Sequence, residues 1–161
     1  MVSSRVACVG ALIRDDRNRV YVHRRWLSRR LLPGTRDVVG GHTEIAGEWE
    51  RLGVSKWMAY SRADGGLAGR GGLSRALVEG QERLEVGWVV RSELWGRGYA
   101  TEIGRAGLAF AFDDLGARQV VAFTDARNAR SRAVMGKLGM RYTRDITYRG
   151  KPDVLYELDR G

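Results

Sequence analysis

Cysteine is almost absent from this sequence, since Cys8 is the only one among 161 residues. An internal disulfide or a cysteine-based metal cluster needs at least two thiols, so both are excluded within the chain. Cys8 stands in an apolar run, where a free thiol usually behaves as a small hydrophobic side chain. We therefore expect a buried, unreactive thiol and not a nucleophile.

Long hydrophobic runs are also missing. No stretch approaches the ~20 apolar residues that a membrane-spanning helix needs. The first ten residues lack the apolar core and small-residue cleavage site of a secretory signal. We therefore expect a cytoplasmic protein without a membrane partner. The apolar content of 43% and the length of 161 residues fit a compact globular fold with its own core.

Lysine and histidine are scarce. The lysines are Lys56, Lys137 and Lys151, so the net charge of +9 comes almost entirely from arginine. A positive field attracts an anionic cofactor, an acidic substrate or RNA on a ribosome. The arginines are dispersed along the chain, however, and solvated charges explain them equally well. Neither His23 nor His42 has a partner at metal-ligand spacing, so we expect no metal site.

One stretch, residues 86–116, organises the rest of the sequence. The apolar run Val86–Val90 leads into the glycine-rich turn 96–100, which opens directly into a helical pattern. Glycines let a backbone approach a ligand closely, and the first amides of a helix lack partners within it. With the helix dipole, such a turn can hold phosphate groups. The G-x-G-x-x-G and G-x-x-x-x-G-K-[ST] patterns are both absent, and an ordinary turn with glycines for packing is the alternative.

The residues on both sides of this turn resemble the motifs of a known family. W-G-R-G-Y-A-T-E follows E-V-G-W-V-V and precedes N-A-R-S-R-A-V-M-G-K-L-G-M. In this order the motifs resemble the GNAT N-acetyltransferases, particularly the branch that acetylates the N-termini of ribosomal proteins. The likeness runs over about residues 57–159. It implies an α/β (α+β) fold with a mixed, mostly antiparallel sheet and two helices after the glycine-rich loop.

Periodicity and turn residues predict the same element order, β-β-β-α-β-α-β-β. Apolar periodicity marks the strands and helices, and glycine, asparagine and proline mark the turns. Glycines in the second strand suggest a bulge. The first helix is expected to be a crossover to a parallel strand. The predicted strands are 57–61, 67–78, 83–91, 119–124, 140–149 and 153–158, and the predicted helices are 101–115 and 129–138.

The N-terminal residues 1–50 show a different sequence pattern from the rest of the chain. Residues 5–13 and 19–23 predict two strands of a hairpin. The hairpin is followed by L-L-P-G-T-R-D-V-V-G-G-H-T-E-I-A-G-E. With this stretch, about Val6–Glu48 resembles the opening of a Nudix hydrolase, but the acidic R-E-x-x-E-E helix that would hold magnesium is missing. We therefore expect residues 1–50 to be a remnant without hydrolase activity. It would replace the usual first strand and helices of the GNAT fold and pack on a core of residues 51–161.

The resemblance also implies a binding site for acetyl-CoA. It places the diphosphate on the backbone amides of the glycine-rich loop, and the pantetheine arm along the open edge of the preceding strand. An amide near Val89 would polarise the thioester carbonyl. Asn128 resembles a cofactor-contacting asparagine, although a helix cap explains it equally. The implied cofactor-binding residues are Trp88, Val89, Val90, Gly96, Arg97, Gly98, Tyr99, Ala100, Thr101 and Asn128.

Two residues are candidates for acid-base chemistry. Glu85 matches a glutamate that some family members use as a base, and it could accept the proton of the amine. A strand glutamate that faces solvent or pairs with arginine is the alternative. Relatives often place a tyrosine proton donor where this sequence has Met135, which cannot donate. Ser131 is the preferred substitute, with Tyr142 and Tyr156 left open.

The sequence therefore predicts an acetyl-CoA-dependent N-acetyltransferase that acts on a protein N-terminus or a small amine by direct transfer in a ternary complex. No metal is expected. A homodimer that completes the acceptor side is left open, as is a ribosomal or other nucleic-acid partner. The alternatives are an acyl-CoA-binding or RNA-associated protein that has lost catalysis and, less favoured, a Nudix-type diphosphate hydrolase.

Overall fold

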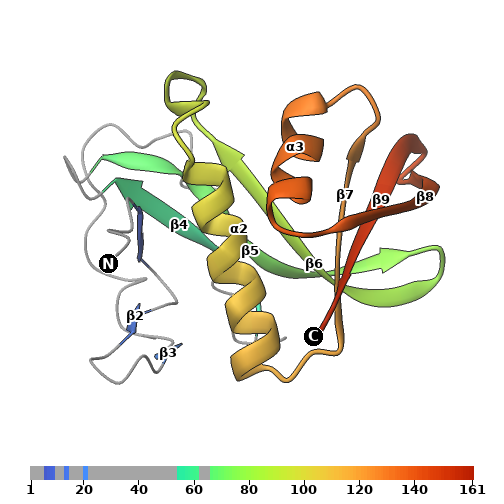
Figure 1. Ribbon diagram of the computed structural model, residues 1–161, viewed down its shortest axis with the longest axis horizontal. Helices are drawn as coiled ribbons and strands as arrows, with labels where there is room; N and C mark the ends of the chain where they lie inside the picture. The colour runs from blue at the N-terminus through green and yellow to red at the C-terminus, as the bar shows by residue number, and fades with distance from the viewer. Residues whose placement is uncertain (1–5, 10–12, 15–19, 22–53, 62–65) are drawn as a thin grey trace.

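A seven-stranded sheet in the order β1-β4-β5-β6-β7-β9-β8 forms the centre of the described structure (Figure 1). The computed structural model describes residues 6–9, 13–14, 20–21, 54–61 and 66–161. All neighbouring strands of this sheet are antiparallel except β6 and β7, which are parallel. The predicted mixed, mostly antiparallel sheet is therefore confirmed.

The described elements follow the predicted order closely. The sheet contains β1 (Val6–Val9), β4 (Lys56–Ser61), β5 (Leu67–Val78), β6 (Gln81–Val90), β7 (Gln119–Asp125), β8 (Arg141–Tyr148) and β9 (Lys151–Asp159). The helical elements are the 3-10 turn η3 (Ser92–Leu94), α2 (Tyr99–Ala109), the π-helical η4 (Phe110–Asp114) and α3 (Ala129–Lys137). The predicted helix 101–115 therefore exists, but it changes to π geometry after Ala109.

Two hairpin turns are tighter than the sequence suggested. The β5–β6 turn consists of Glu79 and Gly80, with φ of 50° and 81°, and the β8–β9 turn consists of Arg149 and Gly150, with φ of 48° and 76°. Positive φ at both central residues is the geometry that matches the twist of paired strands. β6 and β9 consequently begin earlier than predicted. The predicted bulge in β5 is present at Ala68, where the register passes from Gly69 to Leu67.

Both helices cover the same face of the sheet (Figure 1). Leu108 of α2 and Met135 and Leu138 at the end of α3 are buried in one cluster with Val86 of β6. A Cβ at Gly104 would come within 2.5 Å of Leu138 Cδ1, so glycine lets α2 approach the end of α3. The opposite face of the sheet has its own smaller apolar cluster, which includes Val121, Ile146 and Leu155.

The N-terminal strands are described only in their backbone pairing. β1 pairs antiparallel with β4 at the edge of the large sheet. β2 (Ile13–Arg14) pairs antiparallel with β3 (Val20–Tyr21), as in the predicted hairpin, but Val6–Val9 of the predicted first strand pairs with β4 instead. Most of the Nudix-like stretch Val6–Glu48, and the side chain of Cys8, lie outside the described residues. The division at residue 50 stays a prediction.

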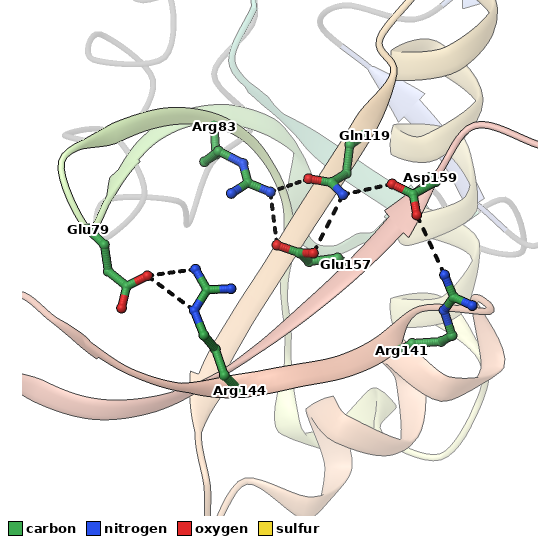
Figure 2. Close-up of polar contacts among 7 residues, drawn as sticks. All are labelled: Glu79, Arg83, Gln119, Arg141, Arg144, Glu157 and Asp159. Atoms are coloured by element: carbon green, nitrogen blue, oxygen red, sulfur yellow. Dashed lines mark hydrogen bonds and ion pairs between the residues drawn. The ribbon is translucent and has the colours of Figure 1, made fainter.

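A polar network fastens β6 to β7 and β9 at one end of their contact (Figure 2). Arg83 donates to the side-chain oxygen of Gln119, and also to Glu157 at 2.9 Å. Gln119 donates to Asp159 Oδ1 at 2.7 Å. The side chains of Arg83 and Glu157 are each 19% exposed, so this ion pair is largely shielded from water. The network holds the parallel strands together on the side of the β5–β6 turn.

Candidate functional site

The parallel strands β6 and β7 separate beyond a single point of contact. Among the described residues, their pairing is recorded at Glu85 opposite Val121. β6 continues to Val90 with β5 on its other side, while β7 continues to Asp125 against β9. The seam between β6 and β7 is therefore closed at the Arg83 end and open towards the C-termini of both strands, which is where parallel sheets commonly bind ligands.

A cavity of about 520 Å³ lies at the open end of this seam. Its volume is within the usual range for a small-molecule site. β6, the loop before α2, the first turn of α2 and one side of α3 contribute to its wall. The lining residues are Trp88, Val89, Val90, Leu94, Trp95, Gly96, Gly98, Tyr99, Ala100, Thr101, Asn128, Arg130, Ser131, Ala133, Val134 and Lys137.

The glycine-rich loop bends sharply to reach the start of α2. Gly96 and Gly98 have φ of 75° and 91°, a left-handed conformation that side chains with a Cβ rarely adopt. Gly98 is the N-cap of α2, and no side chain caps this terminus. The first amides of α2 therefore have no capping side chain at the cavity wall. Amides in this position attract an anion.

The edge of β6 presents backbone polar groups to the open seam. In an antiparallel pair, hydrogen-bonded and non-hydrogen-bonded residue pairs alternate. Arg91 N donates to Ala68 O at 3.0 Å, which places the odd-numbered residues of β6 against β5. Trp88 and Val90 must then direct their backbone groups towards the seam. The Trp95 indole confirms this direction, since its Nε1 donates to Val90 O at 2.8 Å.

One face of α3 forms the wall opposite the glycine loop. Arg130, Ala133, Val134 and Lys137 line the cavity, at the i, i+3, i+4 and i+7 spacing of a single helix face. Sequence reasoning missed these four residues and Leu94. Helix 129–138 was predicted, so placing one of these α3 residues at the cavity would have identified the other three by their helical spacing.

Trp95 and Arg130 connect the two walls across the cavity. The Arg130 guanidinium lies 4.4 Å from the centroid of the Trp95 ring, a cation–π geometry. Trp95 was not among the predicted site residues, although it lines the cavity. Its indole nitrogen donates a hydrogen bond to the Val90 carbonyl of β6, and its ring face contacts the Arg130 guanidinium of α3.

Asn128 and Ser131 lie together at the start of α3. Asn128 Oδ1 accepts from Ser131 N at 3.1 Å, so the predicted N-cap is confirmed. The other end of the amide donates to Thr124 Oγ1 at 3.0 Å, which ties the cap to β7. Both Asn128 and Ser131 line the cavity. Asn128 therefore caps α3 and also lines the cavity, where the resemblance implied a cofactor contact.

Asp125 and Arg127 shape the turn that leads from β7 into α3. The Arg127 side chain hydrogen-bonds Asp125, with Nη2 at 2.8 Å from Oδ2. These hydrogen bonds, joined by one from the Arg127 backbone, lower the pKa of Asp125 to about 2. The carboxylate is therefore ionised throughout the neutral range, and the turn that presents Asn128 keeps its geometry there.

Glu85 does not line the cavity but lies where the seam begins to open. Lys56 Nζ is 3.2 Å from Glu85 Oε2, and the Ser74 hydroxyl donates to the same oxygen. The Glu85 side chain is only 12% exposed. It therefore neither faces solvent nor pairs with an arginine. A Cβ at Gly87 would come within 2.6 Å of Glu85 Oε1 and 3.0 Å of Lys56 Nζ, so glycine is needed there to leave room for this ion pair.

The structure places most of the other predicted site residues at the cavity. Arg97 is exposed and does not line it. The Tyr99 side chain is buried and its hydroxyl lies 3.2 Å from Ser61 Oγ, so only the backbone of this residue suits ligand binding. Tyr156 accepts a hydrogen bond from Arg132, and Tyr142 donates one to Asp145, which raises the pKa of Tyr142. Neither tyrosine lines the cavity, whereas Ser131, the preferred candidate, does.

No helix among the described residues is long and apolar enough to cross a membrane. No group of three or more histidine, cysteine, aspartate or glutamate side chains in them has a geometry that could hold a metal ion.

Known proteins resemble this chain in sequence and fold. It is 34% identical over 105 residues to the uncharacterized protein YkkB of Bacillus subtilis, covering 65% of this chain and 61% of that protein. It is 41% identical over 59 residues to FsC-acetyl coenzyme A-N(2)-transacetylase of Aspergillus fumigatus, covering 37% and 25%. The chain thus spans less than two-thirds of these curated relatives.

A solved structure and a family model agree with these relatives. An acetyltransferase from Agrobacterium tumefaciens superposes with a TM-score of 0.64 and 25% identity, covering 81% of this chain and 74% of that one. The model of the acetyltransferase (GNAT) domain matches residues 9–141. That match covers most of the chain, the open seam and the glycine loop included, and the chain therefore belongs to the acetyltransferase (GNAT) domain family.

Proposed function

We propose that this protein is an acetyl-CoA-dependent N-acetyltransferase. The observation that carries the proposal is the cavity at the open end of the β6–β7 seam, where the glycine loop and α3 form opposite walls. Acetyl-CoA would supply the acetyl group as a thioester. The cavity residues fit its charge, because the lining contains two cations and no carboxylate among the described residues.

Three parts of the wall would hold the donor. The amides from Gly96 to Thr101 would bind the diphosphate at the N-terminus of α2. The backbone groups of Trp88 and Val90 would align the pantetheine arm along β6. Because the Val90 carbonyl already accepts from Trp95, an N–H group of Trp88 or Val90 is the better donor for the oxygen that gains charge during transfer. Val89 itself points its backbone the other way.

Glu85 and Ser131 would manage the protons. Glu85 would accept a proton from the acceptor amine, directly or through water, from its place at the branch point of the seam. Lys56 and Ser74 hold the carboxylate in position there. Ser131 would donate a proton to the departing thiolate, so the amine gains the acetyl group as the thioester bond breaks.

The acceptor belongs to the same proposal. A primary amine is proposed, either a protein N-terminus, as in the ribosomal-protein branch that the sequence resembles, or a small amine. The name of the Aspergillus fumigatus relative, an acetyl coenzyme A-N(2)-transacetylase, supports transfer to nitrogen. The net charge of +9 would favour an acceptor bound to the ribosome or another polyanion. A homodimer would complete the acceptor side, and light scattering would show whether the protein forms a dimer.

The test measures binding and turnover separately. Acetyl-CoA should raise the melting temperature of the full chain, since a ligand that binds only the folded state stabilises it. A panel of N-terminal peptides and small amines should then release free thiol in an amine-dependent way. Stabilisation without thiol release would favour an acyl-CoA-binding protein without catalysis. Magnesium-dependent cleavage of a nucleoside diphosphate compound would favour the Nudix-type alternative, and no response to acetyl-CoA would refute the proposal.

A further inference from the structure

The two cations of the α3 wall are not neutralised by the described chain. Arg130 and Lys137 both line the cavity and are both exposed. Neither forms an ion pair or hydrogen bond with a carboxylate of the described residues, whereas Arg127 pairs with Asp125 and Arg132 donates to Tyr156. Arg127 before α3 and Arg132 on α3 thus have partners outside the cavity, while Arg130 and Lys137 line it.

The position of Arg130 is defined by the Trp95 ring. Its guanidinium lies 4.4 Å from the ring centroid, and Trp95 is in turn held to Val90 O at 2.8 Å. A guanidinium that is stacked in this way loses less freedom when it binds, and its planar donors match the oxygens of a phosphate. Lys137 stands seven residues further along, about 10 Å down the same helix face.

The glycine-loop amides and the α3 cations are separate anion sites on opposite walls. The proposed donor carries two separate anionic groups, the diphosphate and a phosphomonoester on the ribose. The amides at the start of α2 suit the diphosphate. A phosphomonoester carries a charge of about −1.5 to −2 at neutral pH and is the group most favoured by two neighbouring cations.

We infer that Arg130 and Lys137 bind the ribose 3′-phosphate of coenzyme A, so that this wall makes the protein selective for coenzyme A over its dephosphorylated form. The inference rests on the proposed function, because it assigns a further contact to the same cavity. It concerns binding selectivity and involves no chemical step.

The experiment compares coenzyme A with 3′-dephospho-coenzyme A by isothermal titration calorimetry on the full chain, at one fixed ionic strength. Wild-type protein should bind coenzyme A at least about tenfold more tightly, as expected for charge-assisted hydrogen bonds. The double variant Arg130→Met, Lys137→Met should lose this preference. Its affinity for coenzyme A should fall about tenfold while its affinity for the dephosphorylated form stays near that of wild type. Single variants show which side chain contributes more.

The matched control removes two charges from the opposite end of the molecule. Arg118 and Arg160 are exposed neighbours, since Arg160 N donates to Arg118 O at 2.9 Å beside the start of β7. The double variant Arg118→Met, Arg160→Met should keep the wild-type preference. Melting curves of both double variants establish that they are folded.

Three results would count against the inference. Equal binding of both ligands by wild type would overturn it, and so would an equal loss for both ligands in the Arg130, Lys137 variant, because diffuse attraction would then explain the effect. In either case the proposed function would stand. Failure of wild type to bind either ligand would refute the proposed function and the inference with it.

Discussion

The two ends of the β6–β7 seam use the same pair of strands in opposite ways. At the closed end, Arg83, Gln119 and Glu157 join β6, β7 and β9 through side chains (Figure 2). At the open end, the strands part after Glu85 opposite Val121, and backbone groups of β6 face a cavity. Side chains hold the strands together at one end, and polar backbone lines a cavity at the other.

The difference shows how a stable sheet can leave a gap in its middle. Unpaired backbone groups inside a sheet are costly unless water or a ligand satisfies them. The partly shielded ion pair of Arg83 and Glu157 lies at the paired end of the seam, and the Lys56–Glu85 pair lies at the branch point. Variants at the open end should therefore change binding and turnover, and variants at the closed end should change stability.

The largest effect is expected at the branch point. Glu85→Gln keeps the shape of the side chain but removes its ability to accept a proton, so kcat should fall about 100-fold or more. Acetyl-CoA affinity should stay within about twofold, because Glu85 lies outside the cavity lining.

The matched control is Glu82→Gln, an exposed acid on the same strand that pairs with Arg75. Equal kcat values for Glu85→Gln and wild type across the pH range would remove Glu85 from the role of base.

The next effect separates ligand binding from backbone strain. Gly98→Val places a β-branched residue at φ of 91° beside the start of α2. The loop should lose its shape, and acetyl-CoA affinity should fall about tenfold or more, measured by calorimetry.

Gly80→Val is the control, since Gly80 has a similar φ of 81° but lies in the β5–β6 turn. Both variants should be destabilised by about 1–3 kcal/mol. Only Gly98→Val should lose affinity for acetyl-CoA. A similar loss in both variants would contradict the prediction that only the open end of the seam binds the ligand.

A smaller effect is expected from the closed end. Arg83→Met removes the cation that faces Gln119 and Glu157 and leaves a carboxylate that is 19% exposed without its partner. The free energy of unfolding should fall by about 1–3 kcal/mol in a denaturant titration.

Arg144→Met breaks the more exposed Arg144–Glu79 pair as a control and should cost less than about 1 kcal/mol. A loss of kcat in Arg83→Met larger than its loss of stability predicts would mean that the closed end also positions the site.

The smallest effect concerns the turn at the open end. The pKa of Asp125 is lowered to about 2 by Arg127, below the ordinary value of about 3.9. Its contribution to stability should be fully present above pH ~4 and should disappear as the pH falls through ~2. An NMR titration of the side-chain carboxyl carbon would measure this pKa, and Arg127→Gln should move it back towards the ordinary value. An unchanged pKa in that variant would exclude Arg127 as the cause.

Much of the fold could be predicted because its signals are local. Apolar alternation, the Gly96 to Gly98 turn and the Asn128 cap specify strands, loop and helix within a few residues of chain. The turns Glu79–Gly80 and Arg149–Gly150 were placed one or two residues late, because positive φ at a non-glycine residue leaves little trace in the sequence. The change of α2 to π geometry at Phe110 was also not visible.

The sequence by itself determined the order of elements, the glycine-rich turn before α2 and most of the residues of β6 and that turn that line the cavity. Only the tertiary structure decided that one face of α3 becomes a wall of the cavity and that Trp95 holds Arg130 there. It also decided that Glu85 meets Lys56 and Ser74. These contacts join residues far apart in the chain, so they form only when the strands and helices pack together.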